Sequence, residues 1–212
     1  MFKIEILAFR RIRQRHRRVS ALRKIEKLCR LRDLSRIQRH RLVLHPPRPL
    51  SLRSGLPAVL VHGDFWTNNI LFQKRADGAL SDEIAAVIDW QMFHEGSLVR
   101  DITRAMVMCV DGEMRQQNQS DVLRCYCDTL ADLLAEEGTT ISFSFDQVQK
   151  AYRVTFIYQT MLLLCMGPYL ESFDKGVKSE KTEKLLQRAE SAMNEALEML
   201  HEFPIDRFEE CA

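Results

Sequence analysis

Three short apolar runs in the middle of the chain are separated by polar and turn-forming positions. The runs are AVLVH at 58–62, ILFQ at 70–73 and IAAVID at 84–89. Each has the length and side-chain content that are typical of a strand. The loop between the second and third runs contains Asp77-Gly78, a dipeptide that favours a tight hairpin turn. The pattern therefore predicts one strand followed by an antiparallel hairpin.

Beyond Leu98 the apolar positions change to a helical period. One apolar face of the first predicted helix comprises Leu98, Ile102, Ala105, Met106 and Cys109. Further helices are predicted at about 121–137, from Ser144 to near Pro168, and at roughly 179–203. Ser144 and Gln147 have the spacing of a capping box, in which two side chains satisfy backbone groups at a helix N-terminus.

These elements predict an α+β fold that is mainly helical, with a small β hairpin. The chain has 212 residues, 46% of them hydrophobic, which is enough to bury a sizeable core. Its longest apolar run, 154–170, is interrupted by Tyr158, Gln159 and Pro168. Because a membrane span needs about 20 uninterrupted apolar residues, a buried core helix is the favoured interpretation.

Charge and proline positions divide the chain near residue 50. Residues 1–54 contain 17 Lys and Arg against 3 Asp and Glu, whereas the remainder contains 14 against 26. The stretch HPPRPLSLRSGLP at 45–57 breaks any helix, because each proline disfavours helix at the residue before it. We therefore expect a basic, proline-terminated segment at 1–50, helical or disordered, and a second domain at 51–212.

The basic segment has three interpretations. It could be an organelle-targeting sequence, since it is rich in arginine and poor in acidic residues. It could contact nucleic acid or anionic lipid through charge alone, because it contains no named recognition motif. The favoured interpretation is a solvated helix with no separate role, from a truncated or misassigned start.

Cysteine usage predicts a cytoplasmic protein with reduced thiols. No pair has the CxxC spacing of a zinc site, and no secretory signal peptide precedes them. The six cysteines are Cys29, Cys109, Cys125, Cys127, Cys165 and Cys211.

Polar side chains cluster at one end of the predicted hairpin. Asn69 immediately precedes its first strand, Asp89 ends its second strand, and Asp64 lies in the loop leading to that same end. An amide oxygen with a carboxylate suits Mg²⁺, which completes its shell with water and phosphate oxygens. Asp64 would then be available to accept a proton or to orient a hydroxyl. The alternative is that these residues only form Asx turns and end a strand.

A longer motif in this region resembles a known superfamily. The stretches VHGDFWTNNILF and AAVIDWQMFHEGSLVRDITRAM are similar to the aminoglycoside phosphotransferase and choline kinase superfamily, and most similar to its ecdysteroid-kinase-like, or CHK kinase-like, group. The resemblance covers roughly 57–203. The matching motif positions are His62, Gly63, Asp64, Asn69, Asp89, Gly96 and Asp101.

The resemblance implies a role for each matched side chain. Asp64 corresponds to the catalytic base for the substrate hydroxyl, and Asn69 and Asp89 correspond to the Mg²⁺ ligands. Asp101 corresponds to the helix aspartate that holds the catalytic loop, and His62 to part of that loop's scaffold. ATP would be the co-substrate, and the acceptor would be a small-molecule alcohol of a sterol, choline-like or other class.

Three further side chains near the motif are interpreted separately. Trp66 and Trp90 are expected to pack within the fold and not to stack on a substrate. His94 has no mechanistic assignment, and a surface or supporting role is the default.

The resemblance implies a protein-kinase-like C-terminal lobe. Only 61 residues precede His62, and Gly55 is the one glycine among them. Neither a phosphate-covering loop nor the strand–Lys–helix order of an N-terminal lobe is recognisable. We therefore expect the N-terminal lobe to be missing, and the chain to be a truncated kinase-like protein with little or no activity alone.

Two other classes of function stay open. A non-catalytic, kinase-derived interaction module is the main alternative, favoured by the missing lobe, whereas the intact Asp64, Asn69 and Asp89 favour the enzyme lineage. A basic nucleic-acid-binding protein ranks lower.

Overall fold

The computed structural model describes residues 55–173 and 180–202. Within these ranges, 55–156 form one compact unit and the residues from 157 onward belong to a second. The predictions for the basic segment and its boundary at residue 50 lie outside the described residues. The site and its supports all belong to the first unit.

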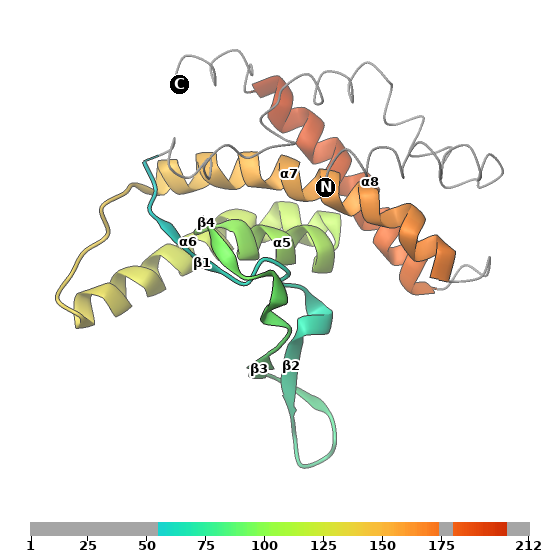
Figure 1. Cartoon of the computed structure of the whole chain (residues 1–212), viewed down its shortest axis with the longest axis horizontal. Coiled ribbons are helices and arrows are strands. Elements are labelled where there is room, and N and C mark those ends of the chain that lie inside the picture. The colour runs from blue at the N-terminus through green and yellow to red at the C-terminus, as the bar shows by residue number, and fades with distance from the viewer. Residues whose placement is uncertain (1–54, 174–179, 203–212) are drawn as a thin grey trace. The chain divides into compact units, whose positions relative to one another are not determined.

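Four strands in the first unit form two separate two-stranded sheets (Figure 1). Strands β2 (Ile70–Lys74) and β3 (Leu80–Val87) pair antiparallel, with Ile70 opposite Val87, so the predicted hairpin is confirmed. Strand β1 (Ala58–Val61) pairs antiparallel with β4 (His94–Ser97). The sequence analysis did not predict β4, because HEGS has neither β-branched residues nor alternation.

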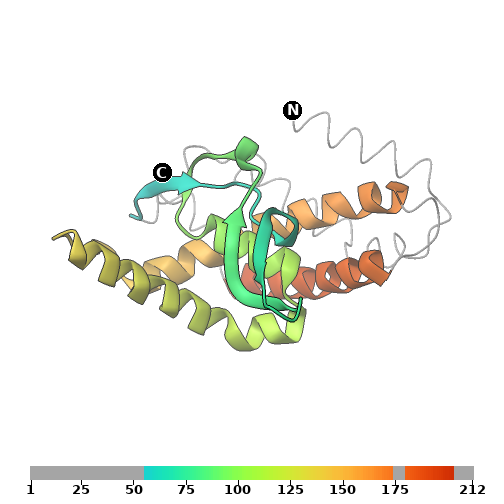
Figure 2. The same cartoon turned by 90° about the horizontal axis from the view of Figure 1, so that it is seen from below.

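The turn of the hairpin forms where Asp77-Gly78 predicted it. Gly78 has a φ of +83°, and its N–H donates to the carbonyl of Arg75 at 2.9 Å. The N–H of Ala79 donates to Oδ1 of Asp77 at 2.9 Å. Strand β3 begins at Leu80 and not at the predicted residue 84, because the hairpin is exposed and its strands carry polar residues. Strands β2 and β3 lie side by side in Figure 2.

The described chain also contains four α-helices and two short 3-10 helices, Thr67–Asn69 and Trp90–Met92. The α-helices are α5 (Arg100–Cys109), α6 (Gly112–Glu136), α7 (Phe145–Phe173) and α8 (Glu180–Glu202). This mixture of a small strand content with a larger helical part confirms the predicted composition of the fold. Helix α6 begins well before the predicted residue 121, because its first turns are mostly polar and carry no apolar period; the buried residue among them is Arg115.

The start of α7 was predicted correctly and its end was not. The N–H of Ser144 donates to Oε1 of Gln147 at 2.8 Å, and the N–H of Gln147 donates to Oγ of Ser144 at 3.3 Å. These two bonds are the predicted capping box. The helix then continues past Pro168 to Phe173, so the predicted end near Pro168 is wrong. A proline removes one backbone donor, and this loss did not end the helix here.

The side chains described in the apolar run of α7, at 154–164, are half-buried or buried, in agreement with the predicted core helix. Phe156 in the first unit is fully buried, and Leu163 and Leu164 in the second are also buried. Among the residues that the structure describes, no helix has the length and apolar content needed to cross a membrane.

Helix α5 buries a different face from the predicted one. Met106 is buried as expected, but Ile102, Ala105 and Cys109 are only half-buried. Thr103 and Arg104 are buried instead. The prediction was therefore right for Leu98 and Met106 and wrong for the other three positions, because Val107 and Met108 are buried in their place and Arg104 contacts the polar loop.

Arg115 is the largest fully buried side chain described, with no exposed surface. Its Nη1 donates to the carbonyls of Val110 at 3.1 Å and Met106 at 3.4 Å, just beyond and within the last turn of α5. Its guanidinium also lies 5.4 Å from the ring centroid of Phe156. The last carbonyls of a helix have no intrahelical donor, so Arg115 satisfies the C-terminal end of α5 and links it to α6 and α7.

We predict that Arg115→Met lowers the free energy of unfolding by roughly 1–3 kcal/mol, because it leaves buried carbonyls unpaired. Urea denaturation measures the loss. The matched control is Arg124→Met, since Arg124 is exposed and stacks 4.4 Å from the Phe145 ring. An exposed pair of this kind contributes about 0.5–1 kcal/mol. Equal losses in the two variants would contradict the role of Arg115.

Candidate functional site

The loop from His62 to Asn69 joins β1 to β2 and passes close to the segment before β4. Gly63 adopts a φ of +85°, where side chains are strained. A Cβ at this position would collide with the carbonyl oxygen of Met92 and lie 3.1 Å from Nδ1 of His94. Only glycine fits here, and the close approach fixes where the loop begins.

Asp101, near the N-terminus of α5, holds the backbone of this loop. Its Oδ2 accepts a hydrogen bond from the N–H of His62 at 2.7 Å, and its Oδ1 accepts one from the N–H of Gly63 at 3.0 Å. Hydrogen bonds to a charged acceptor are stronger than neutral ones. The structure thus brings Asp101 to the loop, in the contact that the family resemblance implied.

His62 connects the loop to the end of β3. Its Nε2 lies 2.8 Å from the carbonyl oxygen of Ile88, and its Nδ1 accepts from the N–H of Asp64 at 3.3 Å. Since the N–H of Asp64 points at Nδ1, Nε2 is the ring nitrogen that faces the carbonyl of Ile88 as a donor. The side chain is 2% exposed, and its ring lies 4.6 Å from that of Trp90. Both nitrogens are engaged, so His62 supports the loop and is not a metal ligand in this arrangement.

Asp64 forms an ion pair that the sequence analysis missed. Nη2 of Arg104 donates to Oδ1 of Asp64 at 2.6 Å. The Arg104 side chain is 9% exposed and that of Asp64 is 26% exposed. Arg104 follows Asp101 by three residues, a spacing that puts both on one side of a helix. The sequence feature from which this contact could have been predicted is therefore the three-residue spacing of Asp101 and Arg104.

Asn69 is buried at the opposite end of the loop. Its Nδ2 donates to the backbone carbonyl of Asp64 at 2.9 Å and to Oδ2 of Asp64 at 3.3 Å. Its backbone carbonyl accepts from the N–H of Ile88 at 2.9 Å, which sets Asn69 beside the residue that precedes Asp89. The predicted neighbourhood of Asn69 and Asp89 is therefore present in the backbone pairing. The Asn69 Oδ1 takes part in none of these bonds and is available as a ligand.

Asp89 has an unusual backbone conformation. Its φ of 64° and ψ of 58° lie in the left-handed region, and it is the one non-glycine residue of the described chain with a positive φ. Aspartate tolerates this region better than most residues, but the conformation costs energy and often marks a functional position. The side chain is exposed and does not cap the short helix that follows.

The donor set fits a hard cation. An amide oxygen from Asn69 and a carboxylate from Asp89 are oxygen ligands, which Mg²⁺ prefers, and Mg²⁺ takes few protein ligands. Within residues 55–173 and 180–202, no group of three or more His, Cys, Asp or Glu side chains could hold a metal ion. A zinc-type site is therefore not present in that part of the chain.

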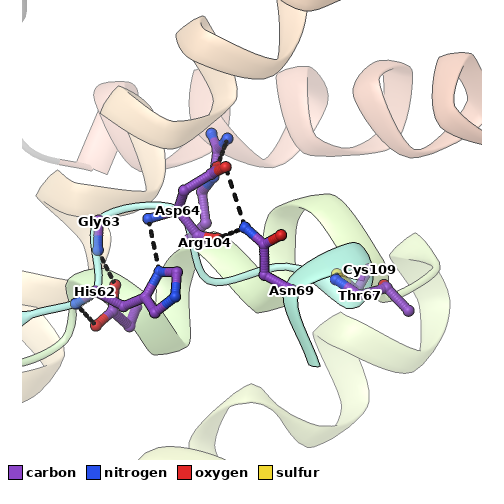
Figure 3. Close-up of polar contacts among 8 residues, drawn as sticks. His62, Gly63, Asp64, Thr67, Asn69, Arg104 and Cys109 are labelled. Atoms are coloured by element: carbon purple, nitrogen blue, oxygen red, sulfur yellow. Dashed lines mark hydrogen bonds and ion pairs between the residues drawn. The ribbon is translucent and has the colours of Figure 1, made fainter. Parts of the chain in front are cut away.

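Helix α5 makes one more contact with the loop, at Thr67. The N–H of Thr67 donates to Sγ of Cys109 at 3.2 Å (Figure 3). The contacts of α5 thus extend from the start of the loop to the short helix that precedes β2. The sequence analysis gave Cys109 no such role, since its position suggested only an apolar face.

The two tryptophans and His94 have local partners. Nε1 of Trp90 donates to the carbonyl of Val87 at 3.0 Å, although the side chain is 48% exposed. Trp66 is half-buried. Nδ1 of His94 lies 2.8 Å from the carbonyl oxygen of Met92, which suits a supporting role.

Two groups on α6 have pKa values that burial shifts. Burial raises the pKa of the Tyr126 hydroxyl on α6, and the charges of Cys127 and Asp101 raise it further. Burial also raises the pKa of the Cys127 thiol, and the charge of Asp128 adds to that effect. Both shifts favour the protonated form of these groups, although the charge of Arg124 acts in the opposite direction on Cys127.

Comparisons with known proteins identify a family. The family model DUF1679, described as "Uncharacterized oxidoreductase dhs-27", matches residues 8–205. The chain belongs to this family. A Caenorhabditis elegans protein, "Uncharacterized oxidoreductase dhs-27", is 28% identical over 148 residues, which are 66% of this chain and 18% of that protein. The match therefore spans less than a fifth of that relative. No solved structure was found to match the chain.

We predict that Asp101→Ala destabilises the protein by roughly 1–3 kcal/mol, because it leaves the N–H groups of His62 and Gly63 unpaired. Denaturation by urea gives the value. The control is Asp121→Ala, which removes an exposed carboxylate from α6 and should change stability by less than about 0.5 kcal/mol. A similar small loss in both variants would argue against Asp101 as the support of the loop.

Proposed function

We propose that this chain carries a phosphotransferase site of the CHK kinase-like type, which transfers a phosphoryl group from ATP to the hydroxyl of a small-molecule alcohol. The observation that carries the proposal is the joining of Asp64 and Asn69 in one braced loop, with the strained Asp89 at the adjacent strand end. The family description names no kinase, so this assignment rests on the motif and the geometry.

Each side chain has a role in the proposed reaction. Asp64 accepts the proton of the alcohol, the alcohol oxygen bonds to the γ-phosphorus, and the bond from that phosphorus to the bridging oxygen of ADP breaks. Asn69 and Asp89 would hold Mg²⁺, which would neutralise charge on the phosphates. His62 and Asp101 keep the loop in place, so the base is positioned before the substrate arrives.

The name of the worm relative suggests a different chemistry, which the present chain does not support. Nucleotide-dependent oxidoreductases often bind their cofactor through a GxGxxG loop. The eight glycines of this chain are too far apart for that motif, the closest pair being Gly55 and Gly63. The matched region is 18% of the relative, so its name can refer to another part of that protein.

A non-catalytic interaction module is the second candidate, and one observation favours it. Large apolar side chains are exposed along the hairpin and the segment that follows it, and such surfaces mark interaction sites. They include Leu71, Phe72, Leu80, Ile84, Ile88, Trp90, Met92 and Phe93.

We predict that Mn²⁺, used as a probe for Mg²⁺, binds the protein in the presence of ADP and that Asp89→Asn weakens this binding by at least about 10-fold. Removing a residue that only hydrogen-bonds to a metal ligand already weakens metal binding by about 10–100-fold, so the loss of a ligand should weaken it at least as much. Electron paramagnetic resonance measures the bound Mn²⁺. The control is Asp82→Asn, an exposed carboxylate of the same hairpin. Equal affinities in all three proteins would remove the metal-site assignment.

A further prediction separates the two candidate functions. Incubation with Mg-ATP and a panel of sterol-like and choline-like alcohols should yield at most a low level of a phosphorylated alcohol, detected by mass spectrometry, in keeping with the low activity expected from the sequence. Asp64→Asn should slow that transfer by about 10²–10⁴-fold, the usual contribution of a general base. Metal-nucleotide binding with no transfer to any alcohol would favour the interaction module instead.

A further inference from the structure

We infer that Arg104 is a positioning residue that fixes the carboxylate of Asp64 in one orientation. The inference rests on the proposed function for the role of Asp64, and on the structure for the contact itself. Arg104 lies in the stretch 85–106 that carries the resemblance, but it is not one of the matched motif positions. It lies on α5, 40 residues beyond Asp64 in the chain.

The two oxygens of the Asp64 carboxylate have different partners. Oδ1 accepts from Nη2 of Arg104 at 2.6 Å, and Oδ2 accepts from Nδ2 of Asn69 at 3.3 Å. Figure 3 shows the carboxylate held between these two side chains. A carboxylate with one oxygen bound could still rotate, but bonds to both oxygens on different sides define its plane.

This arrangement leaves Asp64 able to act as a base. Each carboxylate oxygen has two lone pairs, so one bond to each oxygen leaves capacity for a hydroxyl donor. The side chain is 26% exposed, whereas that of Arg104 is 9% exposed. A substrate can therefore reach Asp64 more easily than it can reach Arg104, which makes Arg104 a supporting group.

Helix α5 would control both parts of the catalytic aspartate's geometry. Asp101 binds the backbone just before Asp64, and Arg104, one turn further along the helix, binds its side chain. The backbone contact alone leaves the side-chain torsions undefined. The buried guanidinium of Arg104, which lies on the same helix as Asp101, restricts those torsions.

The test without enzyme activity is nuclear magnetic resonance of ¹³C,¹⁵N-labelled protein. Three-bond couplings from the backbone ¹⁵N and ¹³C′ to Cγ report the χ1 angle of each aspartate, and the Asp64 signal is identified by its loss in Asp64→Asn. We expect couplings of a single rotamer in the wild type and averaged couplings for Asp64 in Arg104→Met. Those of Asp101 should not change, which shows that the fold is intact.

Three further variants make this measurement decisive. Arg124→Met makes the same substitution at an exposed arginine of α6 and should leave Asp64 in one rotamer. Arg104→Lys keeps a charged donor and should restore most of the single-rotamer population. Arg104→Gln, which keeps a polar head without the charge, replaces Arg104→Met if that variant does not fold. A single rotamer of Asp64 in either uncharged variant would overturn the inference.

A kinetic test connects Arg104 to the proposed reaction. Transfer from Mg-ATP to water, measured as phosphate release, or to any alcohol that the panel identifies, should fall about 100-fold in kcat in Arg104→Met, as expected for a misplaced reacting group. The KM for Mg-ATP should stay within about 2-fold, because only uniform binding changes KM alone.

The double variant shows whether Arg104 acts through Asp64. Arg104→Met added to Asp64→Asn should cause no further loss of kcat, since residues that act as a unit are not additive. An additional loss, or a raised KM in Arg104→Met, would assign Arg104 to another task and overturn the inference. If the wild type shows no transfer, the proposed function fails, and the rotamer measurement still decides the inference about Arg104.

Discussion

The two hydrogen bonds from the carboxylate of Asp101 to the N–H groups of His62 and Gly63 determine the geometry of the candidate site. The loop after β1 is not part of any sheet, so its first backbone donors need an acceptor from elsewhere. Asp101 supplies both oxygens from the first turn of α5. Once that contact is made, His62 can reach the end of β3, and Asn69 can pair with the residue before Asp89.

This dependence explains why α5 carries polar groups toward the loop in addition to its buried apolar residues Met106, Val107 and Met108. Its side toward the loop carries a carboxylate, a guanidinium and a thiol, each with a partner in the loop. The cost of burying such groups is offset only where each has a partner. At the C-terminal end of α5 a buried polar group is also paired, because the carbonyl of Val110, the residue after the helix, accepts a hydrogen bond from the buried Arg115.

Features that depend on neighbouring residues were predictable from the sequence. The hairpin turn at Asp77-Gly78 and the Ser144–Gln147 cap needed only local chemistry, and both are present. The neighbourhood of Asn69 and Asp89 followed from strand pairing alone. Strand β4 and Arg104 were missed because each is defined by a partner more than 30 residues away. The chemical roles of the site residues stay predictions.

At Asp89, the left-handed backbone makes folding stability and the proposed function favour different residues. A glycine there would relieve the strain and would be favoured by folding stability alone. A β-branched residue is excluded by the backbone, whatever its chemistry. Aspartate at this position gives up some stability and keeps an exposed carboxylate at the end of β3, which is the exchange expected if that carboxylate has the proposed role. Screening for thermal stability alone would therefore tend to erase the side chain on which the proposed chemistry depends.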